Sequence, residues 1–456
     1  MTARGRASRG QGGGRVAELA PHESLWMRRA GGPQILIALG LLNLFAYAMR
    51  NALFAVYPDL REAFGLRDAK LGLLTTAFLI PHAIATLPFG WAGDRYDRRR
   101  VIALGMLLAS VAGAAGAFAQ DTTQLAISRA VVGFGTAAVV PVANSILGQL
   151  YEGPRKASRM AIFNLGLLLG GVAGFGVGLA TGFPGVVLVL AIPGVVLSLV
   201  LLALPVPAHP APHDKTSLPR YVLQLWRLFL VEGRQLLRIR TLRWLMLSTT
   251  AMAFAAGGFN AWLLDFLQRE KNMTAGDATS LLMIAMVGAV AGIIVGGRLA
   301  DWLRERLVAG RLWTIVIGMT LAIPCTIACL ELDPGTPRES GLLHFGPGVL
   351  YVVAGTANFF FFSWYHAPMA ATVDDLAPDA EKVAAQGLVI FTMHLFGTAS
   401  SSWVVGEVSD RSDLYTAMYV PAAALVVAAL AMVAAVPSFA ADHLRARSGG
   451  ARTSSL

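Results

Sequence analysis

Long apolar stretches alternate with short polar ones along almost the whole chain. Each apolar stretch is about as long as the roughly 17 to 25 residues that a helix needs to cross a bilayer. The pattern predicts an all-α integral membrane protein with twelve transmembrane helices. The expected spans are, in chain order, residues 34–57, 70–91, 101–119, 124–150, 157–181, 184–204, 242–268, 278–300, 311–331, 347–371, 382–408 and 414–438.

The polar segments divide these spans into two groups of six. Residues 33–204 and 242–438 are each expected to form a six-helix bundle, joined by a proline-bearing cytoplasmic linker at 205–241. The linker contains apolar residues among arginines, so it forms either a helix lying on the membrane surface or an ordinary linker helix. Residues 1–32 have too little apolar content to fold and predict a disordered basic tail. Residues 439–456 form a second, short basic tail.

Composition and charge also indicate a membrane protein. The chain is 55% hydrophobic and 14% charged, whereas soluble domains are about 25% charged. The net charge is +10, and the lysines and arginines gather in both tails and in nearly every second loop. Short loops that stay in the cytoplasm retain such residues, so both termini are predicted to be cytoplasmic. Charges that alternate with spans argue against a nucleic-acid partner, and the Ala-, Gly- and Arg-rich composition suggests a bacterial cytoplasmic membrane.

The sequence contains little that would support an enzyme. Cys325 and Cys329 lie four residues apart inside one span, which predicts packing rather than a disulfide framework or a metal site. A nucleotide-binding loop, a serine–histidine–acid arrangement and metal-ligand spacing are all missing from the sequence. We therefore expect no metal, no cofactor and no ATP-driven pump.

Two polar loops share one pattern and indicate an internal duplication. Gly90 and Asp94 are followed by arginines, and Gly297 and Asp301 repeat this arrangement at an offset of 297 − 90 = 207 residues. The spans before the two loops also align at this offset. Two related six-helix repeats, with the substrate site between them, are the architecture of the major facilitator superfamily, which this chain resembles.

Shorter motifs resemble the Spinster branch of that superfamily, whose members move sphingosine phosphate and lysophospholipids. The matching positions are Leu42-Asn43, Tyr47, Arg50, Pro58-Asp59-Leu60, the Arg129 to Gly135 segment, Arg155, Ser158-Arg159-Met160, Gly258, Trp262, the His394 to Gly397 segment and Asp410. The resemblance covers most of residues 34–438. It implies a secondary transporter that works by alternating access.

Three departures from the Spinster pattern remove acids from the membrane. The pattern has an acid directly before the span-one arginine, where this chain has Met49. It has a glutamate after the span-four glycines and an aspartate in span eleven, where this chain has Thr136 and Thr398. If the family couples transport to protons through these acids, this member does not do so in the same way.

The duplicated loops are expected to form a gate. The resemblance implies that Asp94 stabilises the outward-open form by meeting the start of span eleven and the region of Arg129. Arg95 and Arg98 would clamp the inner face, and glycines at 90 and 93 would let a neighbouring helix approach closely. The candidate gating residues are Gly90, Asp94, Arg95, Arg98, Arg129, Gly297 and Asp301.

Glycines also recur at four-residue intervals in two spans. The two series are Gly170, Gly174 and Gly178 in span five, and Gly288, Gly292 and Gly296 in span eight. Such faces allow helices to pack closely. They are expected to pack helices together, and by extension to form a rocking interface between the two halves.

Arg50 is the most informative charge inside a span. A buried charge in a membrane needs a cavity, a partner or a function. An anionic group of the substrate would supply the missing counter-charge, since a guanidinium binds phosphate or carboxylate through paired hydrogen bonds. The alternative is an arginine that holds helices together by binding carbonyls or Glu407.

Amide and aromatic side chains in the spans predict an amphipathic cavity around Arg50. Polar side chains at membrane depth must face a partner or water, and aromatic rings beside them suit a ligand with a charged head and an apolar tail. The candidate substrate-binding residues are Arg50, Tyr47, Asn51, Thr136, Asn144, Asn260, Trp262, Trp364 and His394.

Histidine is the natural substitute for the missing acids because it titrates near neutral pH. His82, His366 and His394 all fall within spans. His394 lies in the span-eleven motif, and Glu407 is the remaining acid near the end of that span. His394 and Glu407 are therefore the candidate coupling residues, although histidines in spans are more often packing residues.

The preferred function is facilitated or secondary active transport of an anionic amphipathic small molecule or lysolipid. A proton-coupled organic-anion symporter or drug exporter would use the same fold. A transporter-like sensor, which binds its ligand without moving it, is an alternative of another class. The expected partners are a small-molecule or lipid substrate and the membrane lipids, and we expect a monomer.

Overall fold

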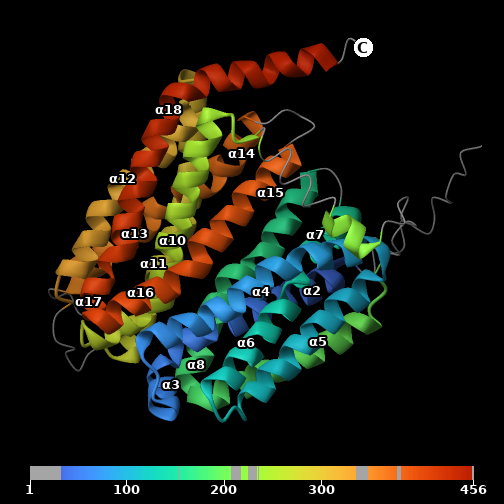
Figure 1. Cartoon of the computed structure of the whole chain (residues 1–456), viewed down its shortest axis with the longest axis vertical. Coiled ribbons are helices and arrows are strands. Elements are labelled where there is room, and N and C mark those ends of the chain that lie inside the picture. Colours follow the sequence, from blue (N-terminus) through green and yellow to red (C-terminus); the bar gives the residue numbers. More distant parts are fainter. Residues whose placement is uncertain are drawn as a thin grey trace, which may run out of the picture.

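The computed structural model describes residues 32–151, 154–206, 217–223, 234, 236–334, 348–376 and 382–453, and all regular elements in these ranges are helices. Nearly all of the predicted tail at 1–32 and most of the linker at 205–241 lie outside the described residues. The helices form two groups that lie side by side (Figure 1). We call residues 32–203 the N-terminal half and residues 240–453 the C-terminal half.

The N-terminal half contains the first six expected spans. Its elements are α2 (Gly32–Ala55), α3 (Tyr57–Phe64), α4 (Asp68–Arg95), α5 (Arg98–Gly116), α6 (Thr122–Thr136), α7 (Val139–Leu150) and α8 (Pro154–Ala203). α8 covers two expected spans. They are divided at Gly182 and Phe183, the two residues inside α8 that are not helical. Gly182 has a positive φ of 62°, a conformation that glycine adopts readily. Asp59 accepts a hydrogen bond from the backbone N–H of Phe183 (2.7 Å) at this break.

The C-terminal half continues the all-helical pattern. Its elements are α10 (Arg240–Arg269), α11 (Ala275–Arg306), α12 (Gly310–Glu331), α13 (Gly348–Phe362), the 3-10 turn η1 (Ser363–Tyr365), α14 (His366–Leu376), α15 (Lys382–Thr392), the π-helix η3 (Met393–Thr398), α16 (Ala399–Arg411), α17 (Leu414–Ala417) and α18 (Tyr419–Thr453). Expected spans ten and eleven are thus each assembled from shorter helical pieces. α18 continues as a helix well beyond the expected end of the last span at 438.

Ten helices among the described residues are long and apolar enough to cross a membrane. The two arms of α8 count as one of these ten, at Ile162–Ala203. α10 is not among them, and its ends carry Arg240, Arg243, Asp265 and Arg269. The chain is therefore an all-helical protein with many helices of membrane-spanning character.

The glycine series pack helices within each half. A Cβ on Gly170 would lie 2.3 Å from the Leu44 carbonyl oxygen, so this glycine holds α8 against α2. A Cβ on Gly292 would lie 2.0 Å from the Phe360 carbonyl oxygen, so this one holds α11 against α13. The expected extension of these faces to a rocking interface between the halves is therefore wrong for this structure.

The two halves meet instead along α4 and α16, close to α3 and α17 (Figure 1). A Cβ on Gly72 would lie 2.2 Å from the Ser402 carbonyl oxygen, and one on Gly406 would lie 2.4 Å from the Asp68 carbonyl oxygen. Backbones this close require glycine on both sides. We call this end of the molecule the α3 end and the opposite end, where α4 finishes at Arg95, the Gly90 end.

Candidate functional site

The candidate substrate site begins with one face of α2. Tyr47, Arg50 and Asn51 are spaced three and four residues apart, so they lie on the same side of the helix. The Arg50 guanidinium carbon lies 5.8 Å from the centre of the Tyr47 ring. Both side chains are partly exposed, whereas Asn51 is buried. The sequence therefore places a charge, a phenol and an amide together in the middle of the protein.

Arg50 has no carboxylate partner in the part of the chain that the structure describes. The expected alternative partner, Glu407, instead pairs with Arg411 on its own helix (2.7 Å) at the α3 end. The Arg50–Glu407 alternative is therefore wrong in this conformation. His82 on α4 and His394 in η3 both lie within electrostatic range of Arg50. Both halves thus contribute to the surroundings of Arg50.

Arg129 on α6 fixes the backbone beneath Arg50. Its guanidinium donates to the carbonyl oxygens of Met49 (3.0 Å) and Arg50 (3.3 Å), and it lies 4.9 Å from the centre of the Phe78 ring. The side chain is buried, and its Nε has no hydrogen-bond partner among the described residues. It lines a small cavity with Met49 and Val132. Arg129 is thus a buried cation, and among the described residues no carboxylate forms an ion pair with it.

This position separates Arg129 from Asp94 in the present conformation, and the contact expected in the outward-open form stays a prediction. Phe78 and Asp94 both belong to α4 and are separated by 94 − 78 = 16 residues. At 1.5 Å per residue this is about 24 Å along the helix. Arg129 therefore lies against the backbone of Arg50 in this conformation, far from the Gly90 loop.

Thr136, one of the residues that replace the family's acids, is bonded to a histidine. His82 Nδ1 lies 3.1 Å from both the Gly133 carbonyl oxygen and Thr136 Oγ1. A carbonyl oxygen can only accept, so this bond places the proton on Nδ1 and leaves Nε2 as the proton acceptor of the neutral ring. A titratable group thus lies next to the position where the Spinster pattern has a glutamate.

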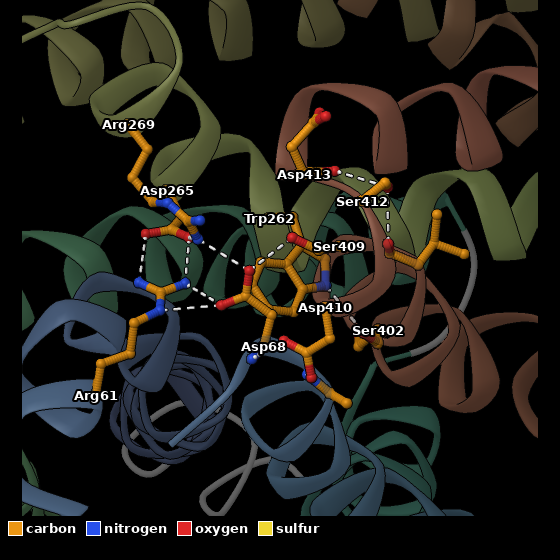
Figure 2. A network of polar contacts seen from close by, with 12 residues as sticks. Arg61, Asp68, Trp262, Asp265, Arg269, Ser402, Ser409, Asp410, Ser412 and Asp413 are labelled. Atoms are coloured by element: carbon orange, nitrogen blue, oxygen red, sulfur yellow. Dashed lines mark hydrogen bonds and ion pairs between the residues drawn. The ribbon is translucent and has the colours of Figure 1, made fainter. Parts of the chain in front are cut away.

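The α3 side of the site is closed by contacts between the halves. Asn260 on α10 donates to Asn51 Oδ1 (3.1 Å), and the rings of Tyr57 and Trp262 lie 5.1 Å apart. Trp262 is fully buried and donates from Nε1 to the Ser402 carbonyl oxygen (2.9 Å). Figure 2 shows Trp262 and Ser402 within this interface. Trp262, predicted to bind substrate, lies in the closed interface here.

Two other predicted binding residues are not joined to Arg50 by the contacts of the structure. Trp364 is buried within the C-terminal half, where its ring packs on Phe360 (5.7 Å between centroids) and its backbone lies against Gly296. Asn144 is half-buried on α7. The contacts thus join Tyr47 to Arg50 and Asn51 to Asn260. Thr136 is bonded to His82, and His394 lies within electrostatic range of Arg50.

Two of the predicted gating residues at the Gly90 end, Arg95 and Arg98, contact the N-terminal half, and Arg95 also lies near the linker. Arg98 donates to the Gly93 carbonyl oxygen (3.3 Å) and to Gln149 Oε1 (2.7 Å). The guanidinium carbon of Arg95 lies 4.8 Å from the centre of the Trp91 ring and 5.8 Å from the centre of the Tyr221 ring in the linker.

The two glycines and the second copy of the loop behave differently. A Cβ on Gly93 would lie 2.8 Å from Val142 Cγ2, so a close approach occurs there. A Cβ on Gly90 would meet nothing within 4 Å, so the expected close approach is missing at Gly90 in this conformation. In the second copy, Gly297 is half-buried and Asp301 is exposed on α11.

Sequence reasoning missed a set of charges at the α3 end. Arg61, Asp68, Asp265 and Arg269 form ion pairs there, and Asp265 is completely buried. A signal was present, because an acid four residues before an arginine near a span end, as at Asp265 and Arg269, is a common helix pair. Nothing in the sequence indicates that α3 would bring Arg61 to the same place.

Comparisons with known proteins identify the family of the chain. The model of the Major Facilitator Superfamily matches residues 39–401. "Protein spinster homolog 3" of Danio rerio is 25% identical over 401 residues, which cover 82% of this chain and 76% of that protein. "Sphingosine-1-phosphate transporter SPNS2" of Mus musculus is 26% identical over 394 residues, which cover 82% of this chain and 69% of that protein.

A solved structure shares the fold. It is the crystal structure of a bacterial homolog of the human lysosomal transporter Spinster, inward-facing and unoccupied, with a TM-score of 0.72 and 20% identity. The match covers 91% of this chain and 98% of that one. Because the family model spans well over half of the sequence, the chain belongs to the Major Facilitator Superfamily, as a Spinster-like membrane transporter.

Proposed function

We propose that this transporter carries an anionic amphipathic molecule, a lysolipid or a small molecule of similar character, whose charged group binds Arg50. The observation that carries the proposal is the guanidinium of Arg50, which has no carboxylate partner among the described residues. A cation within a span requires compensation. A phosphate or carboxylate meets the planar donors of a guanidinium in pairs.

The surroundings of Arg50 support a head group of this kind. Tyr47, Asn51 and Asn260 add one hydroxyl and two amides, which fix the orientation of a bound polar group. The name of the mouse relative, sphingosine-1-phosphate transporter, describes a lipid with an anionic head. We extend only the chemical class to this chain: one anionic head and one apolar tail.

The orientation follows from the charges of the loops. We assign twelve spans by counting both arms of α8 and by adding α10 to the remaining helices of spanning character. The arginine-rich loops at the Gly90 end stay in the cytoplasm, together with both termini. The α3 end then faces outward, and the carrier is closed to the outside here. We further propose a monomer in a bacterial cytoplasmic membrane, surrounded by lipid.

A second candidate function is favoured by the bond between His82 and Thr136. In a proton-coupled anion symporter, His82 would take a proton on Nε2 next to the substrate's charge, with His394 facing it from the other half. Glu407 is less suited to this role, because Arg411 binds it at the end of α16.

Flux into proteoliposomes tests both functions. We expect uptake of a lysophospholipid with an anionic head, and much slower uptake of a cationic amphiphile of the same chain length. Equal uptake of the two would contradict the anion proposal, and saturable binding without any flux would favour a sensor. A pH gradient that accelerates uptake supports the symporter, and one without effect supports a facilitator.

A further inference from the structure

The charges at the α3 end form a closed ring of four. Arg61 comes from α3, Asp68 from the first turn of α4, and Asp265 and Arg269 from the end of α10 (Figure 2). Arg61 lies 2.7 Å from Asp68 and 2.6 Å from Asp265. Arg269 lies 2.9 Å from Asp68 and 3.2 Å from Asp265. Positive and negative groups alternate around the ring, and its formal charge is zero.

Each member of the ring has one partner in its own half and one in the other. Arg61 binds Asp68 within the N-terminal half and Asp265 across the interface. Arg269 binds Asp265 within the C-terminal half and Asp68 across the interface. The arrangement therefore contains two pairs within halves and two pairs between halves.

We infer that this ring is a self-neutralising lock of the outer gate. When the halves separate, the two cross-half pairs break, but Arg61 keeps Asp68 and Arg269 keeps Asp265. Breaking a buried ion pair is costly mainly when one charge is left unpaired in a buried place. Because neither half leaves with an unpaired charge, the lock opens and closes reversibly in each transport cycle.

Burial indicates why the pairing within halves matters. The side chain of Asp265 is 0% exposed and that of Asp68 is 8% exposed, so neither carboxylate is well hydrated in the closed state. Arg61 is 23% exposed. Burial alone would lower the pKa of Arg61, but the hydrogen bonds and charges of Asp265 and Asp68 raise that pKa above its ordinary value. Arg61 therefore stays charged.

Two further contacts act only in the closed state. Ser409 on α16 donates to Asp68 Oδ2 (2.7 Å). Asp410 accepts from the backbone N–H groups of Asp68 (2.9 Å) and Ala69 (3.1 Å), so the other half supplies the N-terminal cap of α4. A carboxylate at this position is stabilised by the helix dipole. These contacts favour closure without adding a member to the ring.

The lock is tested with a reporter cysteine in the closed interface. Cys325 and Cys329 are replaced by alanine, and Thr76→Cys is introduced. Thr76 lies 76 − 68 = 8 residues along α4 from Asp68, and its hydroxyl donates to the Ala399 carbonyl oxygen of the other half (2.6 Å). The full-length chain is labelled in intact cells by a membrane-impermeant maleimide. The labelling rate measures how often the outer gate opens.

Two double variants give the decisive comparison. Arg61→Gln with Asp265→Asn leaves the cross-half pair Asp68–Arg269, and Arg61→Gln with Asp68→Asn leaves the pair Asp265–Arg269 inside one half. Both remove one positive and one negative charge and leave no ion unpaired. We expect the first to label at nearly the parent rate and the second roughly tenfold faster. Equal rates for the two would overturn the lock.

Single variants and a control complete the set. Arg61→Gln alone leaves two acids sharing one arginine, so its labelling should be faster than that of the first double variant. A single variant no faster than the parent would contradict the proposal. Arg67→Gln removes an exposed arginine directly before Asp68, and its rate should equal the parent rate. If Arg61→Gln fails to fold, as judged by size-exclusion chromatography, the comparison of the double variants still decides. No substrate is needed, so the result is independent of anion binding at Arg50.

Discussion

The buried charges around Arg50 and those at the α3 end are balanced in opposite ways. The Arg129 guanidinium donates to the backbone carbonyl of Arg50, and no carboxylate among the described residues pairs with either arginine. The four charges at the α3 end have two opposite partners each. In the proposed function the negative charge at the centre comes from a bound ligand, whereas the charges at the α3 end neutralise one another.

This difference separates a binding site from a gate. A group that must bind a substrate is kept without a competing internal partner, because an internal counter-ion would have to be displaced. A charged gate residue, whose cross-half ion pair breaks and re-forms during transport, keeps one partner in each half. At the Gly90 end the described ion pairs, such as Asp97 with Arg99 and Asp375 with Arg304, lie within one half. The cross-half ion pairs Arg61–Asp265 and Asp68–Arg269 both lie at the α3 end.

Removing the central charge should have the largest effect. We expect Arg50→Ala to weaken binding of an anionic lysolipid by about a hundredfold or more, because the anion would lose charge-assisted hydrogen bonds in a partly buried place. Binding is measured by calorimetry on the purified protein. Arg67→Ala, which removes an exposed arginine at the α3 end, is the matched control. Equal affinities in the two variants would place the anion elsewhere.

Adding an acid to the centre should make it resemble the α3 end. Met49 is buried, precedes Arg50 and has its carbonyl bound by Arg129. Met49→Asp would supply a carboxylate within reach of both guanidiniums, and we expect it to weaken anion binding roughly ten- to hundredfold by competition. Met49→Leu keeps the volume without the charge and should bind normally. A normal affinity in Met49→Asp would show that Arg50 needs no free charge to bind.

The sequence predicted the centre better than the α3 end for a physical reason. Arg50, Tyr47 and Asn51 belong to one helix, so their helical spacing alone places them on one face. His82 and Thr136 come from different spans, and both were visible as polar residues at membrane depth, but only packing reveals that they are bonded. The all-helical pattern follows from apolar length, and ten of the described helices are long and apolar enough to span a membrane. The predicted spans 157–181 and 184–204 already divide at Gly182, whereas the π-helix η3 depends on local geometry that the sequence does not reveal.

The ring at the α3 end could not be read from the sequence. Asp68 and Asp265 are nearly 200 residues apart, as 265 − 68 = 197, and each lies at a span end where a charge is ordinary. Their pairing depends on how far α3 turns back after α2 and on which end of the molecule is closed.

The glycine series led to a wrong prediction of an interface between the halves for a similar reason. Gly170 and Gly292 mark close packing, but spacing cannot say whether the neighbour belongs to the same half.

Spoiling the fit between the halves should have an intermediate effect. A methyl group on Gly406 would lie 2.4 Å from the Asp68 carbonyl oxygen, which is backbone and cannot move aside easily. We expect Gly406→Ala to increase labelling of the Thr76→Cys reporter about five- to tenfold, because overpacking destabilises only the closed state. Gly40→Ala is the control, since a methyl group there meets nothing within 4 Å. If both variants label alike, the ring alone determines closure.

The smallest effect should come from the glycines of the Gly90 end, and it separates a structural from a conformational role. A methyl group on Gly93 would lie 2.8 Å from Val142 Cγ2, a side chain that can shift slightly, so Gly93→Ala should lower the free energy of unfolding by about 1 kcal/mol. Gly90→Ala meets nothing and adds helix propensity, so its thermal unfolding midpoint should be unchanged or slightly higher. If Gly90 is instead needed when the Gly90 end closes, Gly90→Ala will slow flux into proteoliposomes while its unfolding midpoint stays normal. Normal flux in Gly90→Ala would show that only Gly93 of this pair is under steric constraint. Closure at the Gly90 end would then not require a backbone approach as close as that between Gly72 and Ser402 at the α3 end.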